Sequence, residues 1–132
     1  MDEIRVPIIA ESDVLAARQE GRRLATDLGF TGSELAVIAT AISEIARNVV
    51  QHASHGEMVL RVVRGGPQEG IVVVSSDEGP GIGDVAQALQ DGYSTGGGLG
   101  LGLPGARRLM DEFEVVSRPG HGTTITMKKW KS

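Results

Sequence analysis

Cysteine is absent from the 132-residue sequence, and aromatic residues make up only 3% of it. The lack of cysteine excludes disulfides, thiol catalysis and cysteine-ligated zinc or iron–sulfur sites. Positive charge is also scarce, because 13 basic against 17 acidic residues give a net charge of −4. This balance predicts no nucleic acid and no membrane among the partners, since both are bound by neutralising phosphates. No apolar run predicts a signal peptide or a membrane span, so we expect a cytoplasmic protein.

Glycine, by contrast, is abundant. The chain has 19 glycines, about twice the average share in globular proteins. Ten of them lie between Gly79 and Gly105, so the excess belongs to one segment. Hydrophobic residues still make up 40% of the chain, which is enough for an aliphatic core. The length predicts a single domain over residues 1–132.

Apolar periodicity predicts the order of helices and strands. Strands are expected at residues 4–9, 58–63, 71–76, 113–117 and 123–129, and helices at 12–28, 33–53, 85–89 and 104–110. Ser12 is expected to cap the first helix, Gly29 to end it, and Pro7 to mark an edge strand. Short turns between consecutive strands favour antiparallel pairs. The expected fold class is therefore α+β, with a mainly antiparallel sheet and helices on one face; a doubly wound parallel sheet is the weaker reading.

Glu44 and Asn48 lie four residues apart on the long helix, and therefore on one face of it. Thr40, Arg47 and Gln51 share this face, opposite the apolar stripe. A carboxylate and an amide oxygen stacked in this way suit a general base and a ligand for a hard metal ion. Taken alone, the pair is explained better as the solvated face of an amphipathic helix, because a polar face is the rule on such helices.

Asp77 directly follows an apolar strand and opens the turn 77–83, which contains three glycines. A strand of this kind delivers the carboxylate to the end of a sheet, where ligands commonly approach. Asp can accept a hydrogen bond from an exocyclic amine such as that of adenine, and glycines let a flat ligand approach the backbone. A strand ended by a polar turn is the plain alternative.

The tract 96–103 leads into a helix that begins near Pro104, and it has the composition of a phosphate-binding loop. No Gly-Lys pair exists, which excludes a P-loop. Residues 100–105 match G-x-G-x-x-G, but no strand precedes them, as a Rossmann site requires. From Glu78 to Ala106 there is no lysine or arginine. Charge compensation for a bound triphosphate would therefore come from Mg²⁺, backbone amides and a helix dipole.

Together these residues resemble the ATP site of the GHKL superfamily. The elements that carry the resemblance are Glu44-x-x-x-Asn48, Asp77-x-Gly79-x-Gly81, the tract 98–103 and Gly122–Thr123. The resemblance covers essentially the whole chain and is closest to the RsbT-type switch kinases of the bacterial stressosome pathway. Arg47 and the segments 16–19, 40–48, 91–95 and 104–113 carry this closer likeness. It implies a two-layer α/β sandwich of the GHKL (Bergerat) type, with a mainly antiparallel mixed sheet.

The resemblance also implies roles for individual residues. Glu44 would be the catalytic base, Asn48 the Mg²⁺ ligand, and Asp77 the reader of the adenine amine, supported by Thr123 through water. The residues 91–102 would form a lid over the phosphates. The implied ATP-binding residues are Asn48, Asp77, Gly79, Gly81, Ile82, Ser94, Thr95, Gly96, Gly97, Gly98, Leu99, Gly100, Leu101, Gly102, Leu103 and Thr123.

The function implied by the resemblance is that of a serine/threonine protein kinase and partner switch. Its cofactors would be ATP and Mg²⁺, and its substrates STAS-domain scaffold or antagonist proteins. After release it would bind and activate a downstream phosphatase or another output protein. Two alternatives stay open: an anti-sigma factor with kinase activity on a STAS anti-anti-sigma factor, and a nucleotide-binding module without phosphotransfer. Arg47 favours the switch kinase over the anti-sigma factor.

Two groups of residues outside this site need no ligand. His52 and His55 lie at the predicted end of the long helix, where a capping or surface role is expected. The segment 128–131 contains three lysines and Trp130, and it is expected to be a solvated strand end.

Overall fold

The computed structural model describes residues 3–53, 55–79 and 103–131. Its secondary structure follows the predicted order, with ends shifted by one or two residues. The strands are β1 (Glu3–Ile8), β2 (Gly56–Val63), β3 (Gly70–Asp77), β4 (Glu112–Ser117) and β5 (Thr123–Trp130), and the helices are α1 (Glu11–Leu28), α2 (Ser33–His52) and α4 (Leu103–Leu109). The predicted helix at residues 85–89 lies outside the described residues.

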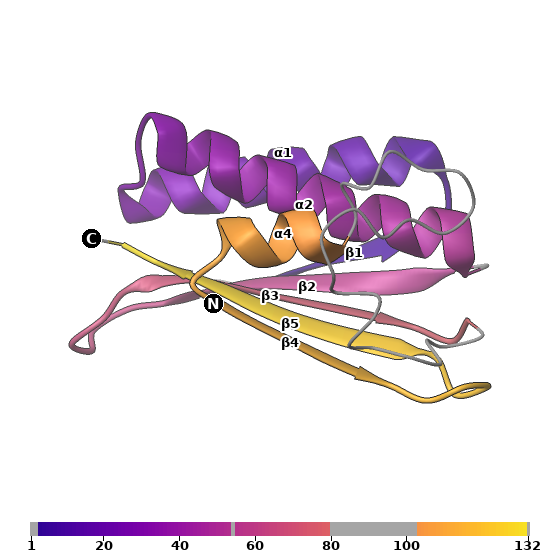
Figure 1. The fold of residues 1–132 in the computed structure, drawn as a ribbon. Helices are drawn as coiled ribbons and strands as arrows, with labels where there is room; N and C mark the ends of the chain where they lie inside the picture. Colours follow the sequence, from indigo (N-terminus) through magenta and orange to yellow (C-terminus); the bar gives the residue numbers. More distant parts are fainter. Residues whose placement is uncertain (1–2, 54, 80–102, 132) are drawn as a thin grey trace.

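The five strands form one sheet in the order β1-β2-β3-β5-β4, and every pairing between them is antiparallel. The three helices cover one face of this sheet (Figure 1). Pro7 lies on β1, an edge strand of the sheet. An edge strand pairs with one neighbour only, so a residue without an N–H group is tolerated there. The predicted α+β sandwich with an antiparallel sheet is confirmed.

The helix α2 occupies the middle of the helical layer. It packs against α1 on one side and α4 on the other, and it lies over the sheet (Figure 1). The predicted apolar stripe of α2, which includes Ile38, Ile42, Ala46 and Val49, is buried in the core. Ala41 and Ile45 are buried as well, because neighbouring helices cover the flanks of α2. Beneath the helices lie the inward-facing residues of the strands, namely Met58, Leu60, Ile71, Val73, Ile125 and Met127.

The start of α1 differs from the prediction. The helix begins at Glu11 with Ala10 as its N-cap residue, so Ser12 lies inside the first turn. The carboxylate of Asp13 accepts the backbone N–H groups of Ile9 at 2.8 Å and Ala10 at 2.9 Å. These two hydrogen bonds, chiefly that of Ala10, lower the pKa of the Asp13 carboxyl. A side chain reaching back from the third helical position thus replaces the expected serine cap.

The end of α1 follows the prediction. Gly29 has a φ of 110°, and its N–H donates to the carbonyls of Ala25 and Thr26. This left-handed ending is the one that glycine favours. Among the described residues, no helix is long and apolar enough to cross a membrane.

Candidate nucleotide site

Asp77 ends β3 at the centre of the sheet. Its neighbours across the sheet are Gly56 on β2 and Thr123 on β5. Side chains alternate along a strand, and Asp77 has the same parity as the core residues Ile71 and Val73. Asp77 and Thr123 therefore lie on the side of the sheet that the helices cover, at the ends of two inner strands.

The carboxylate of Asp77 is held by the turn that follows it. Its Oδ1 atom accepts the N–H of Gly79 at 2.9 Å. Among the described residues no donor contacts Oδ2, which leaves one carboxylate oxygen for a ligand amine. The turn therefore positions this carboxylate as an acceptor.

The C-terminal end of α2 packs directly on this end of the sheet. A Cβ atom added to Gly56, the partner of Asp77, would lie 2.8 Å from Cγ1 of Val49. A Cβ atom on Gly79 would lie 2.8 Å from Cβ of Ala53 and 3.1 Å from the carbonyl of His52. These glycines allow helix and strand to approach closely, which brings Val49, His52 and Ala53 at the end of α2 against the strand end and turn that contain Asp77.

Gly122 brings the start of β5 against the same turn. Its φ is 80°, and an added Cβ would clash with the Asp77 carbonyl oxygen and lie 3.0 Å from Cα of Glu78. Only glycine accommodates both the left-handed backbone and this contact. The Gly122–Thr123 pair is thus a packing element of the Asp77 turn.

Thr123 is 6% exposed, and its hydroxyl lies 2.8 Å from that of Ser117 on β4. The Ser117 hydroxyl donates to the Gly122 carbonyl at 3.0 Å. Since a hydroxyl has one hydrogen, the Thr123 hydroxyl then donates to Ser117 and keeps its lone pairs free to accept. The sequence analysis did not single out Ser117. Its position in the strand alternates in step with Phe113 and Val115, and this alternation indicated a side chain on the inner face of the sheet.

Ser75 is a second missed residue. It is 2% exposed, although it lies in a strand otherwise rich in isoleucine and valine, two residues before Asp77 and on the same side of the sheet. Its hydroxyl extends the polar row formed by Asp77 and Thr123. A serine at a core position of an aliphatic strand was the signal in the sequence that polar side chains enter the core at this end.

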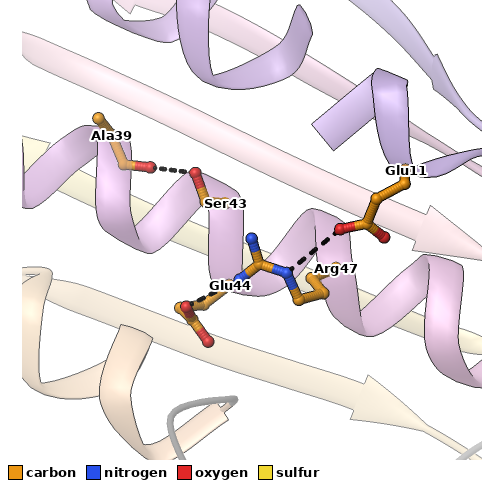
Figure 2. A network of polar contacts seen from close by, with 5 residues as sticks. All are labelled: Glu11, Ala39, Ser43, Glu44 and Arg47. Atoms are coloured by element: carbon orange, nitrogen blue, oxygen red, sulfur yellow. Dashed lines mark hydrogen bonds and ion pairs between the residues drawn. The ribbon is translucent and has the colours of Figure 1, made fainter. Parts of the chain in front are cut away.

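Glu44 lies on α2 with its side chain only 17% exposed. Its Oε1 atom accepts a hydrogen bond from Nη1 of Arg47 at 3.1 Å, and Nε of Arg47 lies 3.5 Å from Oε1 of Glu11 on α1 (Figure 2). Ser43, buried beside them, donates its hydroxyl to the Ala39 carbonyl at 2.8 Å. Glu44 is therefore a half-buried carboxylate neutralised by one arginine.

Asn48 lies one turn beyond Glu44, on the same face of α2, as the i, i+4 spacing predicts. The residue is partly buried. In the part of the chain that the structure describes, no group of three or more His, Asp or Glu residues could hold a metal ion. A single amide oxygen suits Mg²⁺, which commonly keeps phosphate oxygens and water as its other ligands.

Residues 10–129 match the family described as the histidine kinase-like ATPase domain. The chain belongs to this family. It is 46% identical over 129 residues to the serine/threonine-protein kinase RsbT of Bacillus subtilis, an alignment that covers 98% of this chain and 97% of that protein. The predicted resemblance is confirmed.

More distant relatives of this histidine kinase-like ATPase domain include anti-sigma factors. The anti-sigma F factor of Caldanaerobacter subterraneus is 34% identical over 118 residues, covering 86% of this chain and 82% of that protein. The mycobacterial sensor histidine kinase MprB shares the fold, with a TM-score of 0.59 at 16% identity over 96% of this chain and 97% of that chain.

The rest of the predicted nucleotide-binding residues divide into two groups. Leu103 is described: it begins α4 and is 6% exposed, as part of the core. The others lie outside the described residues, namely Gly81, Ile82, Ser94, Thr95, Gly96, Gly97, Gly98, Leu99, Gly100, Leu101 and Gly102.

The residues expected to have no ligand have neighbours within the protein. His55 lies 3.5 Å from the carboxylate of Glu78. The lysines of the C-terminal strand end each lie within 4 Å of an acidic residue, and the Trp130 indole donates to Glu112 at 2.6 Å. This ATPase domain therefore ends in a strand surrounded by ion pairs.

Proposed function

We propose that this protein is a cytoplasmic serine/threonine kinase that phosphorylates STAS-domain proteins with Mg-ATP. The enzyme class rests on 46% identity to a named serine/threonine kinase over nearly the full length of both chains. The structural observation that carries the proposal is the half-buried Glu44 on the helix whose end packs against the Asp77 turn. This packing supports a proposed base on α2 and a proposed adenine-reading carboxylate at the end of β3 that act on the same nucleotide.

Glu44 acts as the general base in this proposal. Its carboxylate accepts the proton of a serine or threonine hydroxyl while that oxygen forms a bond to the γ-phosphorus of ATP. The bond from the γ-phosphorus to the bridging oxygen breaks, and ADP leaves. Partial burial supports this role, because it shields the carboxylate from water that would compete for the same proton.

Asp77 and Thr123 recognise the adenine. The Oδ2 atom of Asp77 accepts the exocyclic amine, and the free lone pairs of Thr123 hold a water molecule beside it. Oδ1 stays with the N–H of Gly79, so the carboxylate cannot rotate away from the ligand. Gly79, Gly81 and the tract 96–102 complete the nucleotide site in this proposal.

Asn48 would hold Mg²⁺ through its amide oxygen. When bound, the ion neutralises phosphate charge, which this chain cannot do with side chains between Glu78 and Ala106 because no lysine or arginine lies there. Arg47, the nearest cation on α2, already contacts Glu44 and Glu11. An ion that takes most of its ligands from phosphates and water fits a site that supplies one amide oxygen.

The partner-switching role extends this proposal. The kinase would leave its phosphorylated STAS scaffold and then bind and activate a phosphatase or another output protein. Resemblance to RsbT supports this role. We further propose that residues 1–132 act as one domain in both states.

The test is phosphate transfer from labelled ATP to purified STAS-domain proteins, with the acceptor residue mapped by mass spectrometry. Label on a serine or threonine is expected, and its absence with every STAS protein of the same organism would contradict the proposal. The second candidate is an anti-sigma factor, which is supported by the 34% identity to anti-sigma F factor. Co-purification of a sigma factor instead of a STAS protein would favour it.

A further inference from the structure

Ser75 interrupts the aliphatic row that β3 presents to the helices. Ile71 and Val73 precede it in this row and are fully buried, and Ser75 itself is only 2% exposed. In the described parts of the chain, its side-chain hydroxyl forms no hydrogen bond. A buried hydroxyl without a partner costs stability, so packing alone does not explain a serine at this position.

The oxygen of Ser75 keeps contact with accessible space on one side. Across the residues that the structure describes, no fully enclosed polar side-chain atom lacks a hydrogen-bond partner. Because the Ser75 hydroxyl has none, its oxygen is not fully enclosed. The neighbours of Ser75 on the same face, Val73, Met58 and Ile125, are buried. Asp77 is partly exposed, so the open side of the hydroxyl is the side toward Asp77.

One water molecule can join Ser75 to the polar pair beside it. Asp77 pairs with Thr123 across β3 and β5, and Ser75 comes two residues before Asp77, roughly 7 Å along the strand. A water that makes two hydrogen bonds spans about 5.5 Å between two oxygen atoms. Side chains also lean along their strand, which shortens the gap. All three side chains are therefore within reach of the same water.

Of these three side chains, only Ser75 has a hydrogen to donate. The Oδ2 atom of Asp77 is an acceptor, and the Thr123 hydroxyl gives its hydrogen to Ser117. A water that donates its two hydrogens to Asp77 and Thr123 has two lone pairs left. The Ser75 hydroxyl donates to one of them. The other lone pair then faces the ligand and accepts a hydrogen from it.

We infer that Ser75 is a specificity-determining residue of the nucleotide site, and that its hydroxyl orients a water which accepts the second N–H of the adenine amine. This inference rests on the proposed function, in which Oδ2 of Asp77 accepts the first N–H. A carbonyl at the same ring position, as in guanine, has no hydrogen for either acceptor. Ser75 therefore extends the selection from one N–H group to a primary amine.

The first test compares ATP with N6-methyl-ATP, which keeps one amine hydrogen and lacks the other. In calorimetric titrations, Ser75→Ala should weaken ATP binding by about 2- to 10-fold and N6-methyl-ATP binding by less than about 2-fold. Ser76→Ala is the matched control, because Ser76 is the next residue of β3 and lies on the opposite face of the sheet. It should bind both nucleotides as wild type does. Equal losses for both nucleotides in Ser75→Ala, or unchanged ATP affinity, would overturn the role of Ser75.

The second test separates ligand binding from folding. Without nucleotide, Ser75→Ala removes a buried hydroxyl that has no partner, so Tm should stay the same or rise. The increase in Tm that ATP causes should be smaller than in wild type. A lower Tm without nucleotide would assign the hydroxyl to the fold and overturn the inference.

The inference and the proposed function can fail separately. If Ser75→Ala discriminates between the two nucleotides as expected but no protein accepts phosphate, the proposed kinase function fails and the role of Ser75 stands. If phosphate is transferred and the two nucleotides are affected equally, the kinase function stands and the role of Ser75 fails. If the wild-type protein binds neither nucleotide, both fail.

Discussion

Asp77 and Thr123 face each other across β3 and β5, and both lie on the side of the sheet that the helices cover. The pair is far apart in sequence and adjacent only through the antiparallel register. Neither residue is part of the apolar core, although both continue the parity of core positions in their strands. This end of the sheet therefore has polar side chains on the face that is apolar along the rest of these strands.

Replacing Asp77 with Asn should weaken ATP binding by roughly 10- to 100-fold, the range for losing a hydrogen bond to a charged group. Affinity for GTP should change little, because guanine has no amine at the matching position. The amide oxygen of Asn can still accept the N–H of Gly79, so the turn should be kept. Calorimetric titration with both nucleotides checks this, and equal losses for both would contradict the adenine assignment.

Replacing Glu44 with Ala should lower phosphate transfer by about 10²- to 10⁴-fold, the usual contribution of a general base. ATP affinity should stay within a few-fold of wild type. Glu11→Ala is the control, because Glu11 is the other carboxylate on Arg47 and lies on α1. Single-turnover transfer from labelled ATP distinguishes them; normal transfer in Glu44→Ala would remove this residue from the base role.

Replacing Ser117 with Ala removes the hydroxyl that contacts Thr123 and Gly122. The Thr123 hydroxyl then loses its acceptor, so ATP affinity should fall by about 2- to 10-fold, as expected for one neutral hydrogen bond. Thr123→Val should give a loss of similar size. If the two act as one unit, the double variant should lose less than the product of the single losses.

Gly122→Ala should destabilise the fold far more than Gly120→Ala. The two glycines have φ values of 80° and 79°, so an alanine at either position has the same backbone strain, about 1–2 kcal/mol. An added Cβ meets nothing within 4 Å at Gly120 but meets the Asp77 carbonyl at Gly122. Urea unfolding of both variants isolates this contact, and equal midpoints would show that it does not matter.

Asp13→Asn should lower Tm at neutral pH and have less effect in acid. Because backbone hydrogen bonds lower the pKa of the Asp13 carboxyl in the folded protein, its stabilisation is present above the ordinary pKa of 3.8. That stabilisation is lost as pH falls through the lowered value. Ser12→Ala is the control and should leave Tm nearly unchanged, although sequence reasoning assigned the cap to Ser12. Thermal melts at about pH 7 and about pH 2.5 compare the two variants.

Much of the fold could be predicted because local patterns determine it. Apolar spacing in α2, alternation in the strands and the turn glycines each depend on neighbours a few residues away. The cap of α1 was misassigned because Ser12 and Asp13 are both good capping residues, and only the path of the chain decides which side chain reaches back to Ala10.

The amino-acid sequence by itself determined the secondary structure, the family and the individual polar residues Glu44, Asn48 and Asp77. The tertiary structure decided which of them meet. Strand register placed Thr123 beside Asp77 and Ser117 beside Thr123, and the packing of α1 on α2 gave Arg47 a second carboxylate. The physical reason is that such contacts depend on long-range packing and pairing, which local sequence patterns do not encode.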